Sequence, residues 1–121
     1  MILVDSSVWI DHFRSTSGEL VLMLSQGRVI QHPFVTAEIA LGNIKDRDEV
    51  IALLTMLPQK APLQDAALLD FVTSFRIFGT GLGMVDAHLL GSVASDDGCK
   101  LWTHDKRLAA KAGELGLLFL P

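Results

Sequence analysis

The chain has 121 residues, half of them hydrophobic, which suffices for one domain around a single core. Its formal net charge of −4 argues against a general, basic nucleic-acid binder, although not against an enzyme that gathers its acids in one pocket. No apolar run is long enough to span a membrane, and a single cysteine, Cys99, excludes an internal disulfide.

Short apolar runs alternate with stretches in which apolar residues recur at helical spacing. Residues 1–4 predict a buried strand and not a signal peptide, so a cytoplasmic location is expected. Further strands are predicted at 29–31, 60–63, 101–103 and 117–120. Helices are predicted at 6–13, 20–26, 34–41, 46–57, 65–75, 84–95 and 106–112. This alternation predicts βαβ units, and hence a single α/β domain over residues 1–121 with a mostly parallel sheet between helices.

Four acidic residues fall where such a sheet would present them to one site. Asp5 and Asp105 each follow a predicted strand, and Glu38 and Asp86 lie in or near the first turns of two predicted helices. Ligands of open parallel sheets bind outside the carboxyl ends of the strands. Carboxylates that converge there typically hold a hard divalent cation, Mg²⁺ or Mn²⁺. Metal-assisted phosphodiester chemistry is therefore the leading interpretation.

Each acid also has a simpler interpretation when it is taken alone. Asp5 or Asp105 could equally cap a helix, Glu38 could be a solvated helix residue, and Asp86 could be a first-turn acid that the helix dipole favours. Apolar neighbours around Glu38 and Asp86 suggest helix faces that point into the protein, where an unpaired carboxylate is costly. Two carboxylates about 5 Å apart repel by roughly 3 kcal/mol at an effective dielectric of about 20, so four together call for a cation.

The order of these motifs resembles that of the PIN-domain ribonucleases, in particular the toxins of VapBC-type toxin–antitoxin pairs. The resemblance covers essentially the whole chain. The matching segments are Leu3-Val4-Asp5-Ser6-Ser7-Val8-Trp9-Ile10, Thr36-Ala37-Glu38-Ile39, Val85-Asp86-Ala87-His88-Leu89-Leu90 and Thr103-His104-Asp105. His88 is a mild departure, because the family's third acid is more usually followed by a small or aliphatic run.

The resemblance implies a three-layer α/β/α sandwich with a central five-stranded parallel sheet. It implies endonucleolytic cleavage of RNA that depends on Mg²⁺ or Mn²⁺, with Asp5 and Asp86 as the strongest metal ligands and Glu38 and Asp105 completing the pocket. Ser7 and Thr103 would orient carboxylates or waters through their hydroxyls. It further implies a small antitoxin partner whose tail places an Arg or Lys near the acids.

Three features outside the acids have competing interpretations. Residues 79–83 predict a glycine-rich loop that could approach an RNA backbone, and they lack the spacing of a nucleotide-binding loop. Basic residues follow the acids along the chain and form either ordinary surface or a rim that positions phosphates: Arg14, Lys45, Arg47, Lys106 and Arg107. Trp9 and Phe13 share one helix face, as core residues or as a patch for an antitoxin or for a homodimer.

The alternative of another class is a receiver-type phosphoacceptor module, which also combines parallel strands with an acidic Mg²⁺ site. That module needs an Asp at the end of its middle strand and a Lys near the end of its last strand. Residues 117–121 contain no lysine, and no Asp is predicted to end a central strand. A non-catalytic interaction domain is a third possibility, which the presence of all four acids disfavours.

Overall fold

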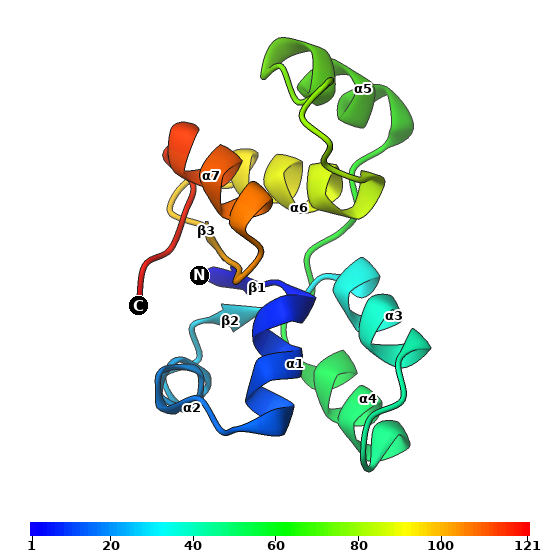
Figure 1. The fold of residues 1–121 in the computed structure, drawn as a ribbon, viewed down its shortest axis with the longest axis vertical. Coiled ribbons are helices and arrows are strands. Elements are labelled where there is room, and N and C mark those ends of the chain that lie inside the picture. Colours follow the sequence, from blue (N-terminus) through cyan, green and yellow to red (C-terminus); the bar gives the residue numbers. More distant parts are fainter.

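A computed structural model describes all residues, 1–121, as three strands and seven helices (Figure 1). The strands are β1 (Ile2–Val4), β2 (Val29–Ile30) and β3 (Lys100–Trp102). The helices are α1 (Ser6–Arg14), α2 (Gly18–Ser25), α3 (Pro33–Leu41), α4 (Arg47–Met56), α5 (Asp65–Ser74), α6 (Met84–Ala94) and α7 (Lys106–Glu114). The α/β class and all seven predicted helices are confirmed. None of the helices has the length and apolar character needed to cross a membrane.

The sheet is parallel in the order β2-β1-β3, with Leu3 aligned with Ile30 on one side and with Leu101 on the other. The expected five-stranded sheet is wrong in its count, because only three strands form. The two missing outer strands are reduced to isolated parallel bridges, Gln31 with Gln59 and Leu101 with Leu118.

Backbone chemistry explains why the outer pairings stay short. Gln59 lies between Pro58 and Pro62, which have no N–H to donate to a ladder. Leu118 is flanked by hydrogen bonds of 2.7 Å from Leu101 N to Leu117 O and from Phe119 N to Leu101 O, and Pro121 follows. The strands predicted at 60–63 and 117–120 therefore do not form. Leu118 lies within the second predicted strand, whereas Gln59 lies one residue before the first.

The core is built around the strands and α6. All of β1 is buried, as are seven consecutive residues of α6 from Ala87 to Val93. A Cβ on Gly91 would overlap the Leu63 side chain and crowd Phe71, so the lack of a side chain there lets α5 and its preceding segment pack closely on α6. A helix buried along most of its length is rigid, and this rigidity steadies Asp86 in its first turn.

The arrangement of the helices brings several chain segments to one edge of the sheet. In Figure 1, α6 and α7 lie on the β3 side, α1 and α2 lie on the β2 side, and α3 packs beside α4. Because all strands run in the same direction, the starts of α1, α3 and α7 follow the carboxyl ends of β1, β2 and β3 respectively.

A buried histidine forms the start of α3. The Nδ1 atom of His32 accepts a hydrogen bond of 3.0 Å from Phe34 N, so Nε2 carries the ring proton, and Nε2 is buried without a partner. Burial, and secondarily the nearby His88, lower the pKa of His32 to about 4. A second ring proton would occupy Nδ1 and break the cap that begins the helix carrying Glu38.

The free energy of unfolding should therefore fall as the pH drops from about 6.5 towards 4, because the unfolded chain takes up a proton that the folded His32 refuses. His32→Asn keeps a capping side chain but cannot titrate in this range. Between pH 7 and pH 5 the wild type should lose about 2 kcal/mol more stability than His32→Asn. Urea unfolding at both pH values measures this difference, and equal losses in the two proteins would contradict the assignment.

Candidate acidic site

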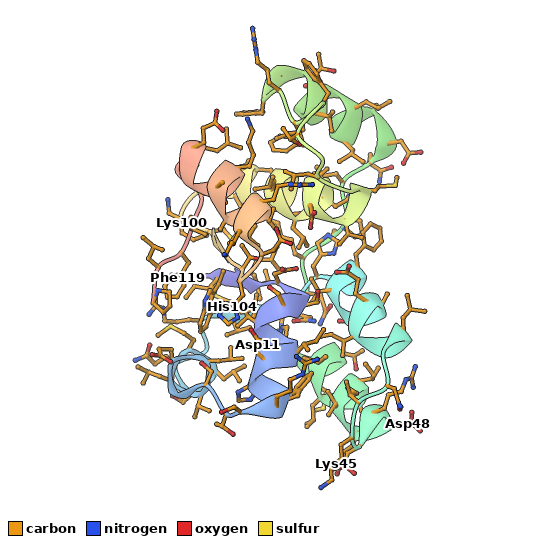
Figure 2. The ribbon with its side chains drawn as sticks, in the orientation of Figure 1. Asp11, Lys45, Asp48, Lys100, His104 and Phe119 are labelled. Carbon is orange, nitrogen blue, oxygen red and sulfur yellow. The ribbon has the colours of Figure 1, made fainter.

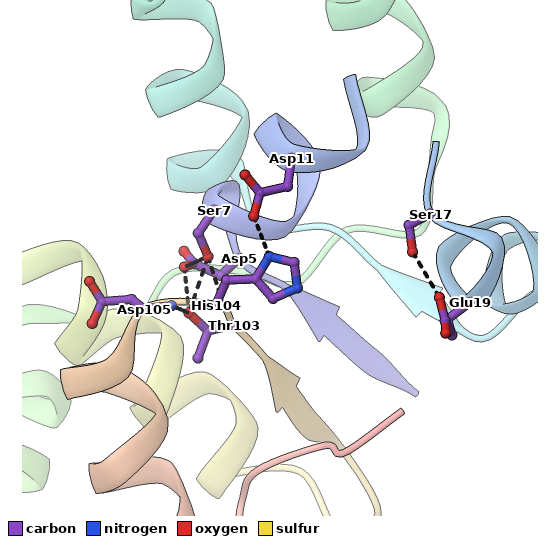
Figure 3. Close-up of polar contacts among 8 residues, drawn as sticks. All are labelled: Asp5, Ser7, Asp11, Ser17, Glu19, Thr103, His104 and Asp105. Carbon is purple, nitrogen blue, oxygen red and sulfur yellow. Dashed lines mark hydrogen bonds and ion pairs between the residues drawn. The ribbon is translucent and has the colours of Figure 1, made fainter. Parts of the chain in front are cut away.

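Asp5 is held by two hydroxyl groups at the junction of β1 and β3. One of its oxygens, Oδ2, accepts hydrogen bonds of 2.7 Å from both Ser7 Oγ and Thr103 Oγ1 (Figure 3). Ser7 Oγ in turn accepts from His104 N, and Thr103 Oγ1 accepts from Asp105 N, each at 3.0 Å. The backbone that carries Asp105 is thus tied through two hydroxyls to a single carboxylate.

Because of these hydrogen bonds, the Asp5 side chain does not act as a helix cap. Asp5 occupies the N-cap position of α1 but its side chain makes no capping hydrogen bond. Although Asp5 is only 5% exposed, its Oδ1 is not among the buried polar atoms that lack a partner, so Oδ1 reaches solvent. One oxygen of the carboxylate is therefore fixed by hydrogen bonds, and the other points outward. This orientation suits a metal ligand better than a helix cap.

Asp105 does cap its helix. Its Oδ1 accepts a hydrogen bond of 2.8 Å from Leu108 N at the start of α7. The neighbouring His104 turns away from Asp105, and its Nδ1 lies 2.5 Å from Asp11 Oδ2 on α1 (Figures 2 and 3). His104 therefore belongs to an exposed pair with Asp11 and not to the group of four acids.

Glu38 and Asp86 approach from the other two helices. Ser6 Oγ donates to Glu38 Oε1 at 3.2 Å, and Gly83 N donates to Asp86 Oδ2 at 3.3 Å. The structure corrects the expectation that Glu38 lies on an inward face, because Glu38 and Ala37 are exposed and only the adjacent Ile39 is buried. Helical geometry explains the error, since consecutive residues turn by about 100° and apolar neighbours in sequence need not share a face.

The four acids are close enough to affect one another electrostatically. Loss of solvation, followed by the charge of Asp5, raises the pKa of Glu38, and Asp86 adds to the effect while the Ser6 hydrogen bond opposes it. Loss of solvation also raises the pKa of Asp86; the Gly83 hydrogen bond opposes this shift, and the charges of Asp5 and Asp105 add to it. Every acid of the predicted set thus appears in one coupled group of charges.

The donor set suits a hard divalent cation. Each of the four carboxylates uses one oxygen in a hydrogen bond within the protein, and none uses its second oxygen in that way. Carboxylate oxygens are the ligands that Mg²⁺ and Mn²⁺ prefer. The pocket is nevertheless more open than a formed metal cage, because no three acidic, His or Cys side chains are placed to hold an ion together.

Two residues of this region escaped the sequence analysis. Ser6 was named only as part of the opening motif, yet it hydrogen-bonds Glu38 across 32 positions of sequence. Asp11 was not singled out, yet it pairs with His104 from a separate element. Neither contact has a local sequence signal, because both partners are brought together by packing of helices and loops that are distant in the chain.

One cavity lies beside the acids, and a second lies on the far side of α1. The first has a volume of about 420 Å³, and its apolar walls include Phe34, Leu41 and Met84 beside Glu38 and His88. The second has a volume of about 300 Å³ and separates α1 and α2 from α4. Its lining residues are Trp9, His12, Phe13, Leu24, Val50, Leu53, Leu54 and Leu57. The acidic pocket is thus one of several places where a larger molecule could contact this chain.

Comparison with known proteins identifies the family. No family model matches the chain. Two relatives, each named Ribonuclease VapC32 and each from a strain of Mycobacterium tuberculosis, are 49% identical to it over 117 residues. The aligned region covers 97% of this chain and 94% of each relative. The chain therefore belongs to the VapC family of PIN-domain ribonucleases, the toxins of VapBC toxin–antitoxin pairs.

Proposed function

We propose that this ribonuclease toxin cleaves phosphodiester bonds inside RNA chains and that Asp5, Glu38, Asp86 and Asp105 hold the Mg²⁺ or Mn²⁺ that it needs. The observation that carries the proposal is the convergence of the four carboxylates: burial, and secondarily the charges of the neighbouring acids, raises the pKa of both Glu38 and Asp86. Mutual repulsion of this kind is relieved by a bound cation.

The protein's own residues have distinct tasks in this proposal. Ser7 and Thr103 orient Asp5 through hydrogen bonds to Oδ2, which leaves Oδ1 directed outward. Gly83 N fixes Asp86 at the start of a buried helix, and Ser6 restrains the longer side chain of Glu38. A divalent ion held by these four carboxylates would lower the pKa of a water and stabilise negative charge on the phosphate.

The structure matches one requirement of the receiver-type alternative but not the other. Asp5 follows β1, the middle strand of the three-stranded sheet, which the sequence analysis did not anticipate. The segment that pairs with β3 through Leu118 contains no lysine. The near full-length similarity to ribonucleases of the VapC family favours RNA cleavage over phosphoryl acceptance.

Cleavage of a fluorescent RNA after chelation tests the proposal. Added Mg²⁺ or Mn²⁺ should restore wild-type activity and raise the melting temperature, because the ion binds the folded pocket and not the unfolded chain. Zn²⁺ should not be required, because the ligands are hard oxygens. Asp5→Ala and Asp86→Ala should retain their fold but lose at least a hundredfold in rate, and neither should recover with metal. Full wild-type activity in excess chelator, or wild-type rates in the double variant, would refute the metal site.

We also propose that the second cavity receives an apolar segment of the antitoxin in a helix-in-groove contact. Its walls are almost entirely hydrophobic, and two of its residues are large and exposed, Phe13 at 36% and Leu53 at 62%. Trp9 is only 4% exposed, so it belongs to the core and forms the floor of this groove. A cationic residue of the antitoxin would then reach the acidic pocket from the adjoining α1.

Other exposed apolar side chains support a homodimer. Leu41 is 88% exposed and Met84 is 70% exposed, and both line the cavity beside Glu38. Burying such a surface against a second copy would remove it from water. The homodimer and the antitoxin would then use different faces of the chain, with the acidic pocket between them.

Phe13→Ser and Leu53→Ser should each weaken binding of the antitoxin encoded beside this protein by at least tenfold, because truncation of a buried apolar anchor commonly costs that much. Leu69→Ser is a matched control, because Leu69 is 68% exposed but lies on α5, outside the groove. Affinity is measured by calorimetry, and RNA cleavage by all three variants should remain near wild type. Equal affinity of the groove variants and the control would exclude this groove as the antitoxin site.

A further inference from the structure

Arg107 lies against the glycine-rich loop at one side of the acidic pocket. Its Nη1 donates to Gly81 O at 3.4 Å. A Cβ on Gly81 would overlap Nη1 and come within 3.1 Å of Cζ, so the guanidinium occupies the space that a side chain would fill. Gly81 also has a φ of +81°, a conformation that other residues rarely adopt. The backbone conformation therefore favours glycine at this position, and a Cβ there would push the guanidinium aside.

This contact joins the two elements that carry Asp86 and Asp105. Arg107 follows Asp105 by two positions in the first turn of α7. Gly81 precedes Gly83, whose N–H donates to Asp86 Oδ2 as α6 begins. A cation on the helix that follows Asp105 thus contacts the loop that precedes Asp86, although the chain as a whole is acidic.

The charge of Arg107 is not neutralised within the protein. The four ion pairs of the chain involve other basic groups: Arg47, Lys60, His104 and Lys111. A guanidinium has five N–H donors in a planar fork, and Arg107 uses one group of them on a backbone carbonyl. The remaining donors can bind two oxygens of a phosphate in parallel.

Two of the other basic residues that follow the acids, Arg47 and Lys45, are less suited to this task. Arg47 pairs with Asp48 at 2.8 Å and donates to Ala40 O. Lys45 lies at the lower end of the molecule's long axis, as does Asp48, whereas His104 lies near the middle (Figure 2). Arg107, by contrast, is in no ion pair and hydrogen-bonds the loop that precedes Asp86.

We propose that Arg107 is a substrate-positioning residue that binds a phosphate of the RNA next to the one that is cleaved, and that Gly81 holds its guanidinium ready for that contact. This inference rests on the proposed RNA cleavage. A phosphate neighbouring the reactive one carries no developing charge, so Arg107 contributes to substrate binding and little to the chemical step.

Steady-state cleavage of a fluorescent RNA by the full chain in Mg²⁺ buffer tests the inference. Arg107→Ala should raise KM at least tenfold with kcat within threefold of wild type, because it removes binding shared by the ground and transition states. The dependence of log(kcat/KM) on log salt should become shallower by about one unit, as expected for one lost phosphate contact. Arg107→Lys keeps the charge but not the fork, so its KM should fall between those of wild type and Arg107→Ala.

Arg28→Ala is the matched control, because it removes the same charge at the opposite edge of the sheet, where Arg28 O pairs with Ile2 N before the strands begin. Its KM should stay within twofold of wild type. Gly81→Ala displaces the guanidinium and should raise KM without further loss in the double variant with Arg107→Ala. If Arg107→Ala does not fold, Arg107→Lys and Gly81→Ala decide the question by the same KM criterion.

Several outcomes would overturn the inference. A KM for Arg107→Ala equal to that of Arg28→Ala would show that no phosphate is bound there, while wild-type cleavage would leave the proposed function intact. A fall in kcat with unchanged KM would show that Arg107 does not bind the substrate and only keeps the elements that carry Asp86 and Asp105 in position. Absence of cleavage by the wild type in any divalent metal would remove the proposed function and this inference together.

Discussion

The hydrogen bonds from Ser7 and Thr103 to Asp5 Oδ2 are the contact on which the rest of the site depends. They connect the end of the central strand to the segment after β3, and through His104 N and Asp105 N they fix the backbone that leads into α7. The two hydroxyl donors satisfy one oxygen of a carboxylate that is otherwise buried. These contacts therefore fix Asp5 at the carboxyl edge of the sheet, where the other three acids gather.

That arrangement costs the fold stability in the absence of a cation. Glu38 and Asp86 have raised pKa values, so each binds protons more readily in the folded chain than in the unfolded chain. Stability from these two groups is present at low pH and is lost as the pH rises through their folded pKa values. The effect is opposite in sign to that of His32, whose buried ring resists protonation. The protein retains the repulsion of its acids at neutral pH, as expected where function and stability compete.

Much of this could be predicted from residues alone, and the failures have physical reasons. Helices with clear caps and apolar periodicity, such as α3 after Pro33 and α7 after Asp105, agree with the pattern. Hydrophobicity does not say how many residues will pair: the strand predicted at 117–120 pairs only through Leu118, and the one predicted at 60–63 is replaced by a bridge at Gln59, between Pro58 and Pro62. The contacts of Ser6 with Glu38, and of Arg107 with Gly81, join positions 32 and 26 residues apart and depend on tertiary packing, which no local motif records.

The central claim is that the four carboxylates form one coupled group that a divalent ion relieves. Carbon-13 NMR of the side-chain carboxyl groups, titrated with pH in chelator and again in saturating Mg²⁺, measures this coupling directly. The account predicts pKa values of Glu38 and Asp86 above their ordinary values without metal, and a marked fall of both when Mg²⁺ is present. Ordinary pKa values in chelator, or raised values that Mg²⁺ does not change, would contradict it.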